Sequence, residues 1–139
     1  MILFSEKIKA QAAAAAKGIG GVVHIDKITD GRILEISQKV TQAAKDTLGE
    51  KLEKVILFGS YARGDFDSGS DVDFFVLADI PQGESNKWSN WIDEHLADLW
   101  FEYDLLVCIH LTSKAVFDRY YKVMPYYQNV ISEGVELHG

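Results

Sequence analysis

Two aspartates at the start of an apolar run are the residues of this sequence best suited to chemistry. They are Asp71 and Asp73, within the segment VILFGSYARGDFDSGSDVDFFV that spans residues 55–76. Aspartate is a poor strand former, so its repetition where a strand begins needs an explanation. Side chains two residues apart on a strand point to the same face. The spacing therefore predicts two carboxylates side by side on one face of a sheet.

A third carboxylate, Asp104, opens the run DLLVCI, which reads as the start of a later strand. If the strand that ends before Gly59 runs antiparallel to the two later strands, all three acidic positions meet at one rim of the sheet. Three carboxylates repel one another, and one of them takes up a proton unless cations lie between them. Mg²⁺ favours one or two carboxylates together with substrate phosphates. The arrangement therefore predicts a magnesium site at this rim.

The end of the first predicted strand carries residues suited to a phosphate group. Gly59 has no side chain, so a phosphate can approach the backbone closely. Ser60 offers a hydroxyl and an amide at the first turn of a short predicted helix, SYARG, whose N-terminus favours an anion. Arg63, one turn further on, can pair with a phosphate oxygen.

Other interpretations of the same segment are weaker. A P-loop needs Gly-Lys-Ser/Thr, but Asp65 follows Gly64 here. An EF-hand loop needs glycine at its sixth position and glutamate at its twelfth, where DFDSGSDVDFFV has serine and valine. A glycine-rich turn with solvated aspartates is the remaining alternative, and an isolated Asp-x-Asp pair would favour it. The combination with Gly-Ser, an arginine and a third aspartate favours the metal site.

The elements that must position these residues follow from hydrophobic periodicity and turn signals. Predicted helices span residues 30–48, 83–103, 113–120 and 125–133, and predicted strands span residues 54–59, 71–78, 103–109 and, at an edge, 135–138. Trp88 and Trp91 lie at helical spacing with apolar residues, which favours core packing over cofactor stacking. The order predicts one α+β (α/β-like) domain over residues 26–139, a small mixed β-sheet flanked by helices.

The composition is that of a globular protein without a surface for nucleic-acid phosphates. Hydrophobic residues make up 47% of the 139 residues, charged residues 25%, and the net charge is −7 with no basic run. Direct nucleic-acid binding is therefore not expected, and no apolar run approaches the roughly 18 residues of a membrane span. The one cysteine, Cys108, reads as a packing residue and fits a cytoplasmic protein without an intrachain disulfide. Residues 1–25, with an alanine block between lysines, read as an N-terminal extension or leader outside the domain.

The spacing of Gly59-Ser60, ten residues and Asp71-Val72-Asp73 resembles the signature of the polymerase-beta-type nucleotidyltransferase superfamily. The string GSYARGDFDSGSDVDFFV is similar to the minimal nucleotidyltransferases of bacteria and archaea. This resemblance extends from about residue 30 to the ending PYYQNVISEGVELHG. It implies the nucleotidyltransferase fold and a Mg²⁺-dependent transfer of a nucleoside monophosphate from a nucleoside triphosphate. The expected donor is ATP, the transferred group AMP and the leaving group pyrophosphate.

The resemblance also implies a role for each candidate residue. Asp71 and Asp73 would ligate Mg²⁺, and Asp104 would complete the metal site and orient or deprotonate the attacking hydroxyl. In a two-metal scheme, ions roughly 3.5–4 Å apart stabilise the attacking and leaving oxygens together. The residues that would hold the triphosphate are Gly59, Ser60 and Arg63.

The implied partner is a HEPN-domain protein encoded alongside, in toxin–antitoxin pairs. In such pairs the nucleotidyltransferase is the antitoxin, and in some of them it adenylylates a tyrosine of the toxin. The chain is too short for a second, acceptor-holding domain, so we expect the acceptor to be held by another protein or by a second copy in a homo-oligomer. Two alternatives stay open: a non-catalytic antitoxin that acts by binding, and a small-molecule nucleotidyltransferase of the aminoglycoside type.

The remaining tyrosines and histidines give weaker signals. The tyrosines of FDRYYKVMPYYQ, residues 117–128, suit a protein interface and half-buried packing equally well. The histidines lack ligand spacing with one another, so surface or packing roles are expected of them. They are His24, His95, His110 and His138.

Overall fold

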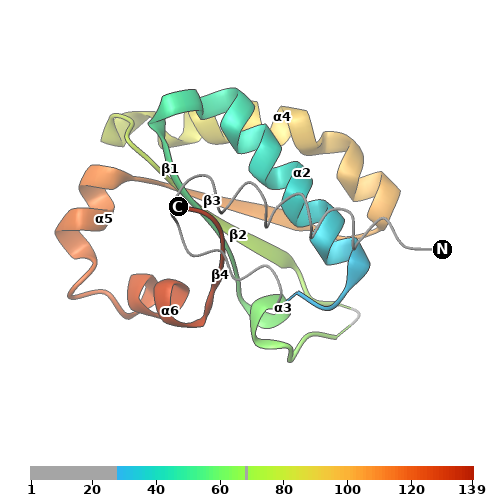
Figure 1. Ribbon diagram of the computed structural model, residues 1–139. Helices are drawn as coiled ribbons and strands as arrows, with labels where there is room; N and C mark the ends of the chain where they lie inside the picture. Colours follow the sequence, from blue (N-terminus) through green and yellow to red (C-terminus); the bar gives the residue numbers. More distant parts are fainter. Residues whose placement is uncertain (1–27, 68) are drawn as a thin grey trace.

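Four strands form one mixed sheet in the order β3-β2-β1-β4, shown in the computed structural model of Figure 1. β1 is antiparallel to both β2 and β4, whereas β2 and β3 are parallel. The structure describes residues 28–67 and 69–139, so the predicted N-terminal extension over residues 1–25 lies outside it. The strands are β1 (Leu52–Phe58), β2 (Val72–Ala78), β3 (Val107–Ser113) and β4 (Val135–His138).

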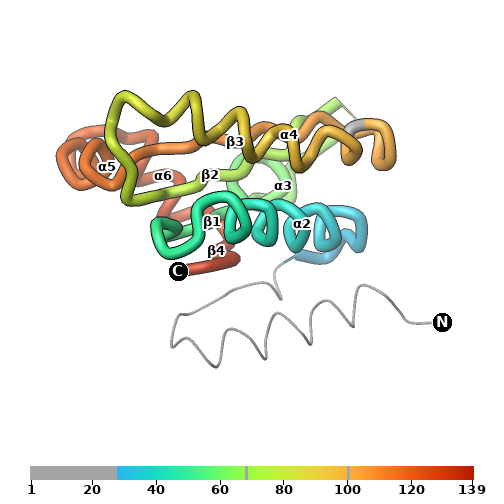
Figure 2. The backbone as a smooth tube through the Cα atoms, turned by 90° about the horizontal axis from the view of Figure 1, so that it is seen from above, coloured from blue at the N-terminus to red at the C-terminus, as the bar shows by residue number. Residues whose placement is uncertain are grey.

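Helices cover both faces of this sheet (Figure 1). α2 and α4 lie beside each other on one face, as the view from above in Figure 2 shows, and α5 and α6 lie on the other. The sheet flanked by helices confirms the predicted α+β class. The α-helices are α2 (Gly31–Leu48), α3 (Ser60–Arg63), α4 (Ser85–Tyr103), α5 (Lys114–Tyr120) and α6 (Pro125–Glu133).

Alternation along β2 creates two cores of different size. Phe74 is fully buried in the larger core beneath α2 and α4, whereas the adjacent Phe75 is fully buried in the smaller core beneath α5 and α6. Each strand residue faces the opposite way from its neighbour, so consecutive phenylalanines serve opposite faces. Asp73 has the same parity as Phe75, which places it on the α5–α6 face. The sheet thus fixes the direction in which the Asp73 carboxylate points.

The aromatic residues of α4 and α6 divide between packing and exposure. Trp88 packs against the larger core, as predicted. Trp91 packs edge-on against Trp88, at 4.9 Å between ring centroids, and stays 40% exposed. In the tyrosine-rich segment, Tyr127 is buried in the smaller core, but Tyr120 and Tyr126 are exposed. The packing interpretation is therefore confirmed for Tyr127.

The third strand begins later than predicted. The expected strand over residues 103–109 is a strand from Val107 to Ser113, because residues 104–106 form a connection between α4, which ends at Tyr103 as predicted, and β3. Asp104 adopts the left-handed conformation (φ 52°, ψ 40°), which aspartate tolerates better than most residues. Asp104 therefore closes a helix and does not open a strand. Among the helices of the described residues, none combines the length and apolarity needed to cross a membrane.

Candidate active site

Asp73, the second residue of β2, is held between the ends of two neighbouring strands. Its Oδ1 lies 3.2 Å from Nε2 of His110 on β3. Its Oδ2 faces the backbone at the end of β1, where a Cβ built on Gly59 would lie only 2.8 Å away. Gly59 itself has φ 79° and ψ −157°, a conformation that only glycine adopts readily. The absence of a side chain at Gly59 therefore makes room for the carboxylate of Asp73.

Asp71 lies immediately before β2 and is exposed. Cys108 on β3 is paired with Asp73, and the charges of both aspartates act on its thiol. Burial raises the pKa of the Cys108 thiol, and the charges of Asp71 and Asp73 raise it further, followed by that of Asp93. The two aspartates thus form a local negative field at the rim of β2 and β3. Both aspartates therefore lie close enough to Cys108 for their charges to act on it.

Asp104 does not join this pair. It lines a cavity of about 340 Å³ together with residues from α2, the loop after α3, and the end of α4. Within residues 28–67 and 69–139, no three His, Cys, Asp or Glu side chains lie close enough together to hold a metal ion. The expected convergence of three carboxylates is therefore corrected to a pair, because the helix end at Asp104 stops three residues short of β3. The other residues that line this cavity are Arg32, Tyr61, Phe66, Asp67, Tyr103 and Leu105.

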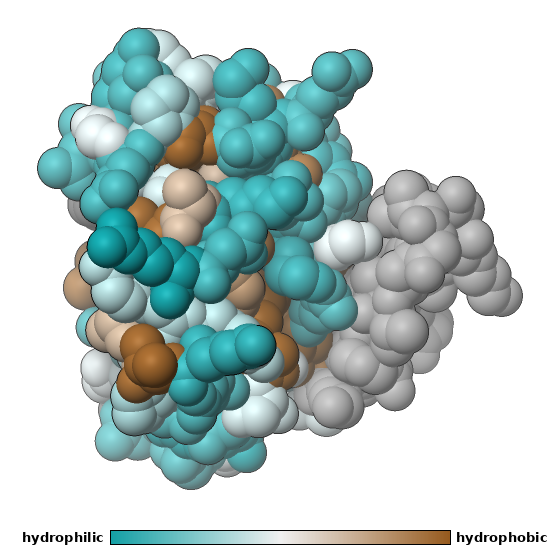
Figure 3. All heavy atoms as spheres, turned by 90° about the vertical axis from the view of Figure 1, so that its left-hand side faces the viewer, coloured by the Kyte–Doolittle hydropathy of each residue, from teal (hydrophilic) through white to brown (hydrophobic). Residues whose placement is uncertain are grey.

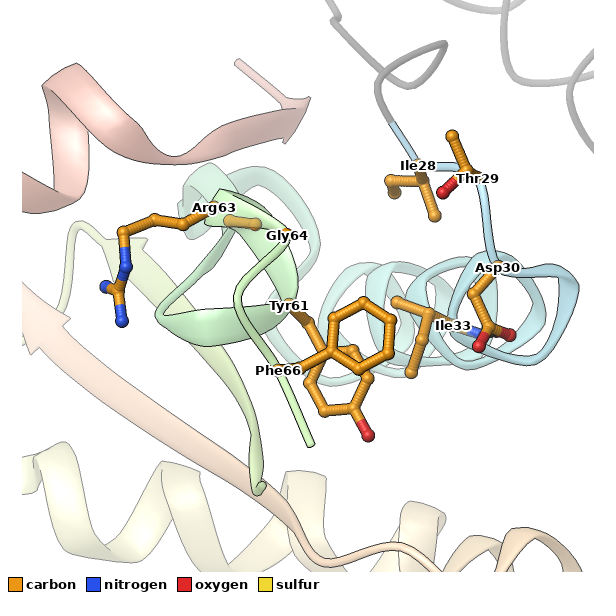
Figure 4. A pocket seen from close by; sticks show the side chains of 9 residues that line it. Ile28, Thr29, Asp30, Ile33, Tyr61, Arg63, Gly64 and Phe66 are labelled. Atoms are coloured by element: carbon orange, nitrogen blue, oxygen red, sulfur yellow. Dashed lines mark hydrogen bonds between the residues drawn. The ribbon is translucent and has the colours of Figure 1, made fainter. Parts of the chain in front are cut away.

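Ser60 and Arg63 occupy the one-turn helix α3 that leaves β1 through Gly59. The Arg63 guanidinium already pairs with two carboxylates: Nε lies 3.2 Å from Oδ2 of Asp65, and Nη1 lies 3.6 Å from Oε2 of Glu133 on α6. Asp65, and after it Glu133, raises the pKa of Arg63 above its ordinary value. In Figure 4 the Arg63 guanidinium points away from the other labelled side chains. A phosphate bound by Arg63 would therefore take the place of these carboxylates.

A stacked aromatic pair separates two cavities next to α3. The rings of Tyr61 and Phe66 lie 4.4 Å apart between centroids at an angle of 16°. Both residues line the 340 Å³ cavity and also a second one of about 250 Å³, which Figure 4 shows against the start of α2. Tyr61 lies in the one-turn helix α3 and Phe66 in the loop after it, so neither belongs to a periodic pattern and sequence reasoning did not single them out.

His110 is a site residue that the sequence analysis missed. It was expected to have an ordinary surface or packing role, yet it contacts Asp73 and packs edge-on against Phe58 at 5.1 Å between ring centroids. Tyr126 of α6 also meets Phe58 edge-on, at 5.9 Å. Partial burial raises the pKa of Tyr126 to about 12, with further contributions from Tyr127 and from the charge of Asp73. His110 reaches Asp73 because of the parallel register that pairs His110 with Phe75. The sequence alone does not specify that register, so it gave no signal for His110.

The donor set at this rim fits magnesium carried with a nucleotide. Mg²⁺ prefers oxygen ligands and is bound by one or two carboxylates, with the remaining positions taken by phosphates and water. Asp71 and Asp73 supply two carboxylates, and the bare backbone of Gly59 borders the second of them. The rim can therefore accept a cation together with a phosphate chain.

Two solved structures show a distant similarity to this chain. One is a toxin–antitoxin with AMP-PNP, at 22% sequence identity and a TM-score of 0.47, covering 74% of this chain and 73% of that one. The other is a mutant of the toxin–antitoxin MntA-HpeT, at 21% identity and a TM-score of 0.45 with the same coverage. These likenesses are too distant to support an inference about this chain.

Sequence comparison identifies the family. The chain is 34% identical over 84 residues to "Putative protein adenylyltransferase MJ0141" of Methanocaldococcus jannaschii, which covers 60% of this chain and 83% of the relative. It is 26% identical over 101 residues to "Putative protein adenylyltransferase MJ0604" of the same organism, which covers 73% of this chain and 93% of the relative. Residues 37–130 match the nucleotidyltransferase domain family, as the Gly-Ser and Asp-x-Asp spacing predicted. The chain therefore belongs to that family and is a nucleotidyltransferase of the minimal type.

Proposed function

We propose that this nucleotidyltransferase transfers AMP from ATP to a hydroxyl group of a partner protein. The observation that carries the proposal is Asp71 immediately before β2 and Asp73 within it, with Oδ2 of Asp73 against the bare backbone of Gly59. A protein acceptor is supported by the two relatives whose names contain the words protein adenylyltransferase, since this chain covers 83% and 93% of their lengths.

The residues at the rim divide the work between the cation and the nucleotide. Asp71 and Asp73 would hold Mg²⁺, which when bound supplies positive charge for the attacking and leaving oxygens. The backbone of Gly59 and the hydroxyl of Ser60 would bind the triphosphate. Arg63 would exchange its two carboxylate partners for phosphate oxygens, because guanidinium pairs well with both groups.

The transfer itself is a displacement at the α-phosphorus. The acceptor oxygen forms a bond to the α-phosphorus, the bond from that phosphorus to the oxygen bridging to the β-phosphate breaks, and pyrophosphate leaves with that electron pair. The acceptor hydroxyl loses its proton to solvent water, because Asp104, the expected base, lines a cavity without the Asp71 and Asp73 pair. Positioning and charge stabilisation account for most of the catalysis in such reactions.

The partner we propose is a HEPN-domain toxin, with this chain as its antitoxin in the cytoplasm. A protein partner is supported by exposed apolar side chains at the connection between α5 and α6, where Val123 is 72% exposed and Met124 is 40% exposed. Figure 3 views this end of the molecule and shows hydrophobic patches between hydrophilic ones. Exposed apolar patches of this kind mark interaction sites in soluble proteins.

Labelling of the partner tests the proposal. The chain is incubated with ATP labelled at the α-phosphate, Mg²⁺ and a HEPN-domain partner, and label on the partner is measured. Asp71→Asn and Asp73→Asn should each abolish labelling, because each removes a cation ligand. Asp79→Asn is the matched control, since it removes the same charge just beyond the opposite end of β2.

Three other outcomes would contradict the proposal in distinct ways. Normal labelling by both variants would show that the pair does not hold the cation. Toxin neutralisation that survives loss of both carboxylates, without labelling, would indicate an antitoxin that acts by binding alone. Product formation from ATP and an aminoglycoside without any protein partner would indicate a small-molecule nucleotidyltransferase.

A further inference from the structure

The contact between His110 and Asp73 at the rim has no direct part in the transfer reaction. Nε2 of His110 lies 3.2 Å from Oδ1 of Asp73, and the two residues come from the neighbouring parallel strands β3 and β2. A carboxylate only accepts hydrogen bonds, so the imidazole Nε2 donates to it. The His110 side chain is 41% exposed and that of Asp73 26% exposed, so the contact lies at the open edge of the site.

The contact constrains one oxygen of Asp73 while leaving the other in place for a ligand. Oδ1 is engaged by His110, and Oδ2 lies on the side of Gly59, where a Cβ would approach it to 2.8 Å. A carboxylate on a strand otherwise rotates about its terminal bond, because that torsion is broad. With one oxygen bonded and the other against a backbone, the plane of the Asp73 carboxylate is fixed.

His110 is itself held in place by its surroundings. Its ring packs edge-on against Phe58 at 5.1 Å, and Phe58 lies opposite Asp73 in the antiparallel register of β1 and β2. The three side chains therefore form a row across three adjacent strands on one face of the sheet. Edge-to-face aromatic pairs of this kind favour one ring orientation over others. His110 is thus positioned to present Nε2 to Asp73.

We propose that His110 is a positioning residue, which orients the Asp73 carboxylate for cation binding through the Nε2 hydrogen bond. The proposal rests on the proposed function, in which Asp73 is a cation ligand. Carboxylates that bind metal ions are themselves commonly hydrogen-bonded, and loss of such a partner typically lowers metal affinity or activity roughly 10–100-fold. The same loss of cation affinity is expected here when the His110 donor is removed.

Two substitutions separate the hydrogen bond from the packing. His110→Phe keeps a ring against Phe58 but removes the donor, whereas His110→Gln keeps an N–H donor without the ring. His95→Phe is the matched control, because His95 is an exposed histidine on α4 whose Nδ1 contacts only the backbone oxygen of Trp91 among the hydrogen bonds of the described residues. Mn²⁺, which accepts the same oxygen ligands as Mg²⁺, serves as the probe.

The primary readout is Mn²⁺ binding to the full chain, measured from the EPR signal of the free ion. The second readout is the Mg²⁺ concentration that gives half-maximal transfer. We expect His110→Phe to raise the Mn²⁺ dissociation constant about 10–100-fold, with His110→Gln restoring most of the affinity and His95→Phe leaving it unchanged. The Mg²⁺ requirement should rise in parallel, with the KM for ATP at saturating Mg²⁺ changing little. The melting temperature of each variant reports on folding.

Several results would overturn the inference. Wild-type affinity in His110→Phe, alongside lost affinity in Asp73→Asn, would show that the contact does not position the ligand while leaving the metal site intact. Loss of affinity in His110→Gln but not in His110→Phe would assign His110 a packing role instead, because only phenylalanine keeps a ring against Phe58. If His110→Phe fails to fold, His110→Ala replaces it, and equal losses in His110→Ala and His110→Gln would then assign the packing role. Unchanged Mn²⁺ binding in Asp73→Asn itself would overturn the metal site, and the inference with it.

Discussion

The orientation of the Asp73 carboxylate depends on two neighbours, the hydrogen-bond donor His110 and Gly59, which has no side chain. His110 binds one oxygen, and Gly59 leaves room for the other. The sequence indicated the glycine, although for the close approach of a phosphate and not of the Asp73 carboxylate. It did not indicate the histidine, because the strand register that brings His110 to Asp73 depends on the whole sheet. Individual residues at this site are therefore predictable only where the requirement is local.

Gly59→Ala tests the local requirement. The new Cβ would meet Oδ2 of Asp73 at 2.8 Å and would hold a positive φ that side chains disfavour. We expect it to lower the free energy of unfolding by roughly 2–3 kcal/mol and to reduce transfer activity, since Asp73 must move. Chemical denaturation and the labelling assay measure the two effects.

Gly64→Ala is the control for this prediction. Gly64 also has a positive φ of 86°, but a Cβ there would meet nothing within 4 Å. It should lower the free energy of unfolding by only about 1 kcal/mol, from the backbone conformation alone. Equal losses in the two variants would mean that Gly59 is needed for its conformation and not for the space it leaves to Asp73.

At the scale of elements, the predicted and observed helices and strands differ mainly in where they begin and end. The helices ending at Leu48 and Glu133 end where glycine follows, and the sequence located both ends. The end of α4 at Tyr103 was also predicted, but no glycine or proline marks the connection after it, and the apolar run there was predicted as strand from residue 103 although β3 begins at Val107. The shift removed Asp104 from the expected cluster. Elements were predicted well where a residue type enforces a boundary and poorly where tertiary packing sets it.

The junction between α6 and β4 depends on one such glycine. A Cβ at Gly134 would overlap Cγ2 of Ile56 and the backbone oxygen of Val130, and it would lie 3.2 Å from the backbone oxygen of Leu57. Gly134→Ala should therefore lower the free energy of unfolding by roughly 1–3 kcal/mol, as overpacking does. Thermal and chemical unfolding measure this loss.

Gly83→Ala serves as the control for Gly134→Ala, because a Cβ there meets nothing within 4 Å. Alanine should be neutral or slightly stabilising at this position, since it reduces the entropy of the unfolded chain. A stable Gly134→Ala variant would show that β1 and α6 can move apart at this junction.

At the scale of the whole molecule, the last strand is tied to elements far away in the sequence. β4 pairs with β1, and its His138 lies near Lys45 of α2 and Lys54 of β1. Its Nδ1 is buried and has no hydrogen-bond partner among the described residues. Burial lowers the pKa of His138 below 6.5, the nearby lysines lower it further, and Glu136 opposes them. The folded protein therefore disfavours a proton that the unfolded chain accepts.

This difference predicts acid sensitivity below about pH 6.5. As the pH falls through the ordinary histidine range, the unfolded chain binds more protons at His138 than the folded chain, so the free energy of unfolding falls. His138→Gln should flatten the dependence between roughly pH 7.5 and 5.5, measured by chemical denaturation at each pH. His95→Gln, at an exposed position, should retain it. A steeper dependence in His138→Gln than in the parent would contradict the assignment.

The ion pairs of Arg63 have a consequence for how the molecule receives its substrate. Because Asp65 and Glu133 are both largely in contact with water, separating them from the guanidinium costs little, and water rehydrates them at once. If the triphosphate binds at Arg63, as we propose, it meets a guanidinium that Glu133 on α6 already holds in place. The phosphates would then displace Glu133, so the charge at the surface of α6 would differ between the empty and the nucleotide-bound protein.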